Sequence, residues 1–137
     1  MSLKYKLISQ IADIRLKVEA DDLLQLFVIA LEGMNSIMKE KRDERGEKRK
    51  RIISVGSPDE TALLVDFLNE VLYQSHTNKE IYEEIRFLEF SETALKAEIY
   101  GQEVDGFDED IKAATYHEAD IVKNKNNNWE TIIVFDI

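Results

Sequence analysis

Two aspartates and the last residue of the sequence have the chemistry needed to hold a metal ion. The sequence closes on Asp136 and Ile137, which places the Asp136 side chain and the main-chain carboxylate of Ile137 one residue apart. Asp13 stands in an otherwise apolar stretch, IADI at residues 11–14, although aspartate is a poor strand former. Carboxylates packed closely repel one another unless they stay in water, pair with a cation or bind a hard metal ion.

These groups act together only if the first and last strands of the fold are neighbours. The oxygens of Asp13, Asp136 and Ile137 would then converge, with Ile137 contributing a main-chain carboxylate or carbonyl. Oxygen ligands of this kind select Ca²⁺, Mg²⁺ or Mn²⁺ rather than Zn²⁺. The alternatives for Asp13 are a strand end, a bulge or a solvated face, and the spacing alone favours them over a metal site.

His117 is one of only two histidines and follows Thr115 and Tyr116. It could be a metal ligand, a proton carrier or a hydrogen-bonded structural residue, and the residue taken alone favours the structural role. His76 is expected near the end of a helix, where a positive charge interacts favourably with the helix dipole.

Several classes of enzyme lack any support in the sequence. There is no cysteine, no serine in a G-x-S-x-G turn, no P-loop and no G-x-G-x-x-G motif. We therefore expect a protein that is not an enzyme. A hydrolase or transferase that uses His117, Asp13 and Asp136 as an acid–base set is the least favoured interpretation.

Length and composition predict one domain spanning residues 1–137. Of the residues, 44% are apolar and 34% are charged, values that suit a globular protein. We find no signal peptide and no apolar run of membrane-spanning length, so we expect no membrane partner. Together with the absence of cysteine, this predicts a cytoplasmic location.

The net charge of −10 argues against broad or sequence-specific binding of nucleic acid, whose backbone is also negative. The charge is uneven, because the segment 39–52 contains 8 of the 18 basic residues. We interpret residues 39–51 as a mobile basic loop, and its role stays open between simple solvation and docking of a partner.

The hydrophobic pattern predicts an α+β fold in which two helices pack on an antiparallel or mixed β-sheet. One helix is expected to start at Asp21–Asp22 and end near Lys39, and the other to be capped by Ser57 and end near His76. The second half is expected to be an antiparallel meander with an asparagine turn at 126–128. The expected strands are 4–18, with a break near 10–13, and Ile52–Val55, Ile81–Phe90, Ala94–Gly101, Lys112–Val122 and Trp129–Phe135.

The sequence resembles the archease family over essentially its whole length. The stretch IKAATYH at 111–117 and the closing VFDI at 134–137 are similar to the last two family motifs. Ala12 and Asp13 match the end of the first motif. The stretches DDLLQLFVIAL (21–31) and DETALLVDFLNEVLY (59–73) look like the two family helices.

The resemblance implies a protein that activates an RtcB-type RNA ligase, an enzyme that joins tRNA exons or repairs broken RNA. Archeases are thought to help guanylylation of the ligase and to restore its turnover. The resemblance also implies a metal held by Asp13, Asp136 and Ile137, with Ca²⁺ favoured and Mg²⁺ or Mn²⁺ as alternatives. Lys112 and His117 would lie beside that site or touch the partner.

The sequence departs from the family pattern at one place. Ser9-Gln10-Ile11 stands where the family has an acidic residue, histidine and threonine, so a carboxylate and an imidazole are missing beside the expected site. Their loss would weaken or retune activation if they orient the ligands or touch the ligase. The alternative function is that of a chaperone or modulator of an RNA-modifying enzyme such as a tRNA methyltransferase.

Overall fold

The computed structural model describes residues 4–9, 13–38, 40–41 and 47–137 of the chain. Two helices and ten strands lie in the described ranges, and three of those strands contain only two residues. In chain order they are β1 Lys4–Ser9, β2 Asp13–Ala20, α1 Leu23–Met38, β3 Glu40–Lys41, β4 Arg49–Gly56, α2 Glu60–Asn78, β5 Glu80–Phe90, β6 Ala94–Glu103, β7 Gly106–Phe107, β8 Ala113–Thr115, β9 Val122–Lys123 and β10 Trp129–Asp136.

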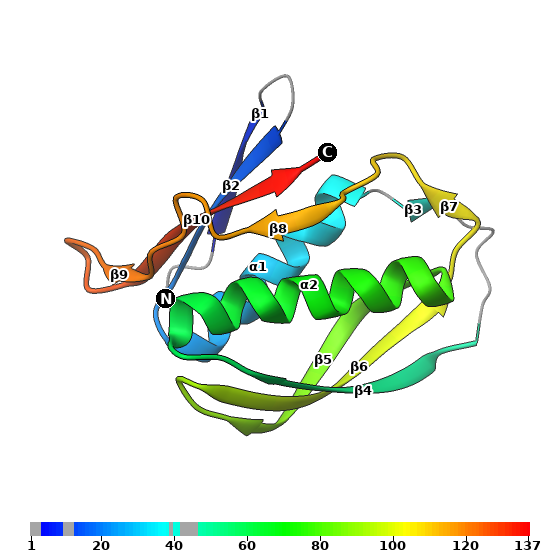
Figure 1. Cartoon of the computed structure of the whole chain (residues 1–137), viewed down its shortest axis with the longest axis horizontal. Helices are drawn as coiled ribbons and strands as arrows, with labels where there is room; N and C mark the ends of the chain where they lie inside the picture. Colours follow the sequence, from blue (N-terminus) through cyan, green and yellow to red (C-terminus); the bar gives the residue numbers. More distant parts are fainter. Residues whose placement is uncertain (1–3, 10–12, 39, 42–46) are drawn as a thin grey trace.

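The expected α+β fold class is confirmed, and both helices lie between two antiparallel sheets (Figure 1). One sheet has the order β1-β2-β10-β8, with β9 also paired to β10, and the other has the order β4-β6-β5. A short pair, β3 with β7, forms a third sheet. The expected meander is wrong, because β5 and β6 pair in one sheet while β8, β9 and β10 lie in the other, where β10 also pairs with β2.

The N-terminal segment is a hairpin in place of one broken strand. β1 and β2 pair antiparallel from Lys4 opposite Glu19 to Ser9 opposite Ile14, and the expected break falls between them. Residues 10–12 of that break lie outside the described ranges. The predicted start of α1 is confirmed, since the Gln25 amide donates to the Asp22 carboxylate at 2.7 Å.

Helix α1 lies very close to the central strand β2. A Cβ on Gly33 would lie 2.6 Å from a Leu16 methyl carbon, so only glycine allows this spacing without displacing Leu16. The Phe27 ring extends from α1 to Phe67 of α2 at 5.6 Å and to Phe90 of β5 at 5.1 Å between centroids. These aromatic contacts join both helices and the second sheet in one core.

Helix α2 starts and ends two residues later than the sequence pattern predicted. Its N-cap is Asp59, whose carboxylate accepts a hydrogen bond from the Ala62 amide at 2.9 Å, and the helix continues to Asn78. The predicted cap, Ser57, donates its hydroxyl to the Asp66 carboxylate at 2.5 Å. A carboxylate at Asp59 also interacts favourably with the positive end of the helix dipole, which explains why the aspartate takes the cap.

Two predicted segments are wrong in extent. The predicted strand Lys112–Val122 is interrupted, because only β8 and the start of β9 are extended and residues 116–121 form a turn and coil. The basic segment 39–51 is not wholly a loop, since Arg49–Arg51 begin β4 and Glu40–Lys41 pair with β7. Residues 42–46 of this segment lie outside the described ranges.

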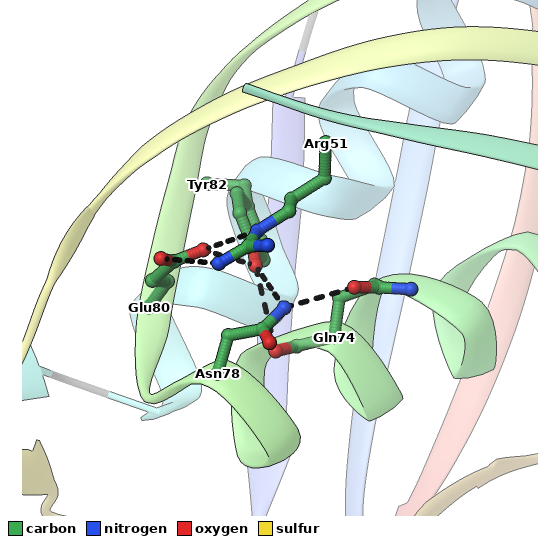
Figure 2. Close-up of polar contacts among 5 residues, drawn as sticks. All are labelled: Arg51, Gln74, Asn78, Glu80 and Tyr82. Atoms are coloured by element: carbon green, nitrogen blue, oxygen red, sulfur yellow. Dashed lines mark hydrogen bonds and ion pairs between the residues drawn. The ribbon is translucent and has the colours of Figure 1, made fainter. Parts of the chain in front are cut away.

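A buried polar network joins the second sheet to the end of α2 (Figure 2). The guanidinium of Arg51 in β4 donates two hydrogen bonds to the Glu80 carboxylate, at 3.0 and 2.9 Å. Tyr82 donates its hydroxyl to the same carboxylate at 2.7 Å and accepts from the Asn78 amide at 3.2 Å. Burial and the contact with Glu80 raise the pKa of Tyr82 to about 12. The phenol is therefore a permanent donor at neutral pH.

We expect the Arg51→Met variant to be less stable than the wild type by about 2 kcal/mol. The Glu80 side chain is only 2% exposed and would lose its cation, a loss that costs ~3–5 kcal/mol in a fully buried pair. Arg51 is 37% exposed, which reduces the effect. Urea denaturation measures the change, and adding Glu80→Gln to the variant should restore part of the stability. A loss below ~0.5 kcal/mol would mean that the network contributes little.

A second buried carboxylate anchors the hairpin between β9 and β10. The Glu19 carboxylate of β2 accepts hydrogen bonds from the side-chain amides of Asn128, at 2.9 Å, and Asn124, at 2.8 Å. Asn127 has a φ of 62°, which confirms the predicted asparagine turn. The hydrogen bonds from Asn128 and Asn124 lower the pKa of Glu19. The carboxylate thus ties the turn to the central strand.

Stability should fall in mild acid because of Glu19 and Glu80. Burial raises the pKa of Glu80, but the bonds from Arg51 and Tyr82 outweigh it, so both pKa values lie below the ordinary 4.5. A lowered folded pKa gives stability that is complete above the unfolded pKa and is lost as pH falls through the folded value. Urea unfolding from about pH 6 to 3 measures this loss. Glu19→Gln should flatten the decline, and an unchanged slope would contradict this role for Glu19.

Candidate functional site

The register of β2 and β10 places the two aspartates of the predicted site side by side. Asp136 lies directly opposite Asp13 at the end of this antiparallel ladder. Cα atoms of directly opposite residues are about 4.5–5.5 Å apart, and their side chains extend from the same face of the sheet. The condition that the sequence left open, neighbouring first and last strands, is therefore met.

Asp136 is held in position from both sides. Besides its pairing with Asp13, it lies opposite Ala113 of β8, and its carbonyl accepts a hydrogen bond from the Lys112 amide at 2.8 Å. The side chain of Ile137 packs against the hydrophobic core. Packing of that side chain restricts where the main-chain oxygen of Ile137 can lie, one residue from the aspartate pair.

The two carboxylates have the chemistry of a cation site. Oδ1 of Asp13 is buried and has no hydrogen-bond partner in the described part of the chain, while Asp136 is exposed. No ion pair among the described residues neutralises either carboxylate. Two like charges placed opposite each other destabilise a sheet, and a hard divalent cation would remove that penalty. The oxygen donors of Asp13, Asp136 and Ile137 thus fit Ca²⁺, Mg²⁺ or Mn²⁺.

Such a site would be only partly filled by this chain. Within the described ranges, no three His, Asp or Glu side chains lie close enough together to hold a metal. An ion here would therefore have two side-chain ligands, Asp13 and Asp136, together with main-chain oxygen. Ca²⁺ takes 6–8 oxygen ligands, so the remaining positions would be open to water or to a group from another molecule.

Arg15 is a neighbour of the site that sequence reasoning missed. It lies two residues from Asp13 on β2 and therefore on the same face of the sheet. Its guanidinium donates to the Glu118 carboxylate at 2.5 Å, across the position of Val134, which lies opposite Arg15. The spacing i, i+2 in a strand was the signal that would have placed Arg15 here. Because Arg15 is paired with Glu118, it leaves Asp13 without a cation.

The predicted neighbours Lys112 and His117 are exposed. The main chain of Lys112 supports Asp136, as described above, and the His117 ring lies 3.9 Å from the carboxylate of Glu118. In the described part of the chain, no hydrogen bond or ion pair joins either side chain to Asp13 or Asp136. His117 is 76% exposed, so it is available for contact with another molecule.

The turn that carries His117 is fixed to α2 by its neighbour Tyr116. Tyr116 donates its hydroxyl to the Asp66 carboxylate, which also accepts from Ser57. The bond to Asp66 raises the pKa of Tyr116. Glu118 has a φ of 63°, a left-handed conformation that turns the chain back towards Arg15. This turn at residues 116–118, called the anchored turn below, holds His117 and Glu118 on the surface beside β10.

The second histidine is part of the structure near the end of α2. The His76 ring lies in the last turn of the helix, as predicted, and its Nε2 is 3.0 Å from the carbonyl oxygen of Ile111. It thereby supports the segment that leads into β8. None of its described contacts involves the aspartate pair.

A sequence profile of the Archease protein family (MTH1598/TM1083) matches residues 5–137. The chain belongs to the archease family. Two relatives named "Protein archease" support this membership. That of Methanosarcina acetivorans is 32% identical and that of Methanosarcina mazei is 30% identical, and each alignment covers 98% of this chain and 96% of the relative.

Two solved structures share the fold of this archease-family chain. One is the solution structure of Methanobacterium thermoautotrophicum protein 1598, with a TM-score of 0.72, 21% identity and coverage of 97% of this chain and 98% of the other. The second is the crystal structure of an archease from Thermotoga maritima, described as a possible chaperone. Its TM-score is 0.71, its identity is 16%, and 96% of each chain is covered.

Three sequence-based expectations about this archease-family chain stay predictions. One is the effect of the altered first motif, since Gln10 and Ile11, which replace family residues beside the site, lie outside the described ranges. The assignment of Asp13, Asp136 and Ile137 to a metal and the identity of that metal also stay predictions. No helix among the described residues is long and apolar enough to cross a membrane.

The Asp13→Asn variant should separate folding from metal binding. It removes one of two facing charges, so without metal it should be as stable as the wild type or more stable by roughly 0.5–1 kcal/mol. Ca²⁺ should raise the melting temperature of the wild type and leave the variant unchanged. Thermal unfolding with EDTA and with Ca²⁺ measures both effects. A variant that Ca²⁺ stabilises as strongly as the wild type would remove Asp13 from the site.

Proposed function

We propose that this protein is a non-enzymatic activator of an RtcB-type RNA ligase and acts through a divalent cation bound at Asp13, Asp136 and Ile137. The observation that carries the proposal is the Asp13–Asp136 pair. The two residues lie directly opposite each other on neighbouring strands, and no cationic side chain among the described residues pairs with either carboxylate. Membership of the archease family supports a helper function. The ligase is named as the partner because the motifs at residues 111–117 and 134–137 resemble those of archeases.

The open coordination of the site suits a role in contact with another protein. The cation would supply a concentrated positive charge that polarises oxygen ligands. Ca²⁺ is the ion that the resemblance favours, with Mg²⁺ or Mn²⁺ as alternatives. Asp13 and Asp136 would hold it, and the anchored turn would present His117 and Glu118 beside it. A phosphate or carboxylate of the ligase complex could then complete the coordination, which an isolated archease-family chain leaves unfilled.

The absence of catalytic machinery supports a helper rather than an enzyme. The sequence has no cysteine and no phosphate-binding glycine motif, and in the described part of the chain His117 contacts neither aspartate. Without the ligase, the protein should therefore turn over neither RNA nor GTP. Turnover by the purified protein alone would revive the hydrolase or transferase interpretation.

A chaperone or modulator of an RNA-modifying enzyme is the second candidate. The archease of Thermotoga maritima that shares the fold is described as a possible chaperone. A chaperone would suppress aggregation of an enzyme such as a tRNA methyltransferase without needing a metal. The two functions thus differ in their dependence on Asp13.

The decisive test is a guanylylation and ligation assay with an RtcB-type ligase, Mn²⁺ and GTP. The wild-type protein should stimulate multiple turnovers, and Asp13→Ala should lower the stimulation at least about tenfold, equivalent to a loss of ~1.4 kcal/mol. The matched control is Asp105→Ala, which removes an exposed aspartate from the loop between β6 and β7.

The outcomes of this assay separate the two candidates. Circular dichroism should first show that both variants are folded. Stimulation that is equal for wild type and Asp13→Ala would contradict the metal-dependent mechanism. If neither stimulates the ligase while wild type suppresses methyltransferase aggregation with or without EDTA, the chaperone function takes its place.

A further inference from the structure

A groove of about 820 Å³ runs along helix α1, between the edges of the two large sheets. α1 forms one wall, β5 forms the opposite wall, and Tyr5 of β1 closes one side. None of the residues of the aspartate site lines the groove, so the groove is a separate feature of the surface.

The middle of the groove is apolar. Leu24, Val28 and Leu31 follow one another at helical spacing on α1, and Ile85 and Phe87 oppose them on β5. Four of these five side chains, all but that of Leu31, are only partly buried, although each lies on an element of the core. An occupant with its own apolar face would remove this surface from water.

The rim of the groove is acidic. Glu32 of α1 and Glu83 and Glu84 of β5 line it, and none of its described lining residues is basic. Lys48, outside the groove, pairs with Glu84 at 2.6 Å, and both of these side chains are more than half exposed. An apolar floor between carboxylates is complementary to a segment that combines apolar residues with lysine or arginine.

Two features of the walls bear on the shape of that segment. β5 is an edge strand, but its ladder is irregular at Tyr82/Glu84 and again at Phe87/Glu89, which leaves few residues in regular register for an added strand. On the α1 side, Leu24, Val28 and Leu31 form a ridge of the kind that packs against another helix. The walls therefore favour a helix over an extended strand.

Asn35, one of the residues that line the groove, has a side-chain oxygen without a hydrogen-bond partner among the described residues. The side-chain amide of Asn35 donates to the Tyr82 carbonyl at 2.8 Å, which sets the orientation of the carboxamide. Its Oδ1 is buried and has no partner among the described residues. One wall of the groove thus carries a side-chain acceptor that the described residues leave unpaired.

We propose that this groove binds a basic amphipathic helix of a partner protein. The apolar face of the helix packs on Leu24, Val28 and Phe87, and flanking lysines or arginines pair with the rim glutamates. Affinity for the helix does not depend on the metal site or on ligase activation. The helix proposal and the proposed function can therefore be rejected independently of each other.

The test uses three fluorescein-labelled peptides of 14 residues. The first has leucines at i, i+3, i+4 and i+7 with lysine and arginine elsewhere, and the second replaces the basic residues by glutamate. The third has the composition of the first, with its four leucines at i, i+2, i+4 and i+6. Fluorescence anisotropy should show saturable binding of the first, with affinity at least tenfold higher than for the other two.

Two variants and one control place the binding in the groove. Val28→Gln removes apolar floor, and Glu32→Lys reverses a rim charge on the exposed surface of α1. Each should weaken binding of the first peptide at least tenfold. Glu92→Lys makes the same charge change in the turn between β5 and β6 and should leave binding unchanged.

Four outcomes would overturn the proposal. The first is binding of the basic peptide that Val28→Gln does not weaken, which would mean general attraction to an acidic protein. The second is stronger binding of the alternating peptide, which would make the occupant a strand. The third is self-association in sedimentation that Val28→Gln abolishes, which would make it a second copy. Absence of binding at millimolar protein concentration would also reject it.

Discussion

The pairing of β2 with β10 is the constraint on which the rest of the molecule depends. These strands are at opposite ends of the sequence, and their register alone places Asp13 opposite Asp136. Side chains alternate between the faces of a sheet, so a slip of one residue would send the two carboxylates to opposite faces. The same slip would turn Ile133 and Phe135, now buried, towards water. Core packing therefore fixes the geometry of the polar site, although its two carboxylates repel each other.

Much of the secondary structure follows from short-range patterns that the sequence displays clearly. The face of α2 that includes Leu63, Phe67 and Val71 is buried, because helical spacing is local and the core selects it. The cap at Asp59 was missed, since Ser57 and Asp59 both have suitable side chains and the choice depends on the contact of Ser57 with Asp66. Local propensity cannot decide between such alternatives.

The errors of larger scale come from pairings between distant residues. Periodicity indicated that residues 129–135 are extended, but it does not state which strands lie beside them. β10 pairs with β2 as well as with β8 and β9, and none of these strands lies in the sheet of β5 and β6. The predicted strand 112–122 failed because Tyr116 and Glu118 are held by side chains distant in sequence, Asp66 and Arg15. The aspartate pair was predictable only in part. The residue types indicated which side chains could bind a metal, but only the topology shows that their strands are neighbours.

The distribution of charge differs between the two surfaces that we propose as binding sites of this archease-family chain. At the aspartate pair, two carboxylates on rigid strands converge, which favours a small, hard cation over a flexible side chain. In the groove, Glu32, Glu83 and Glu84 are spread along a rim around apolar side chains, a spacing too wide for one ion and suited to a row of cationic residues. The acidic residues behind the net charge of −10 thus form two different arrangements, and each suits a different one of the two proposed partners.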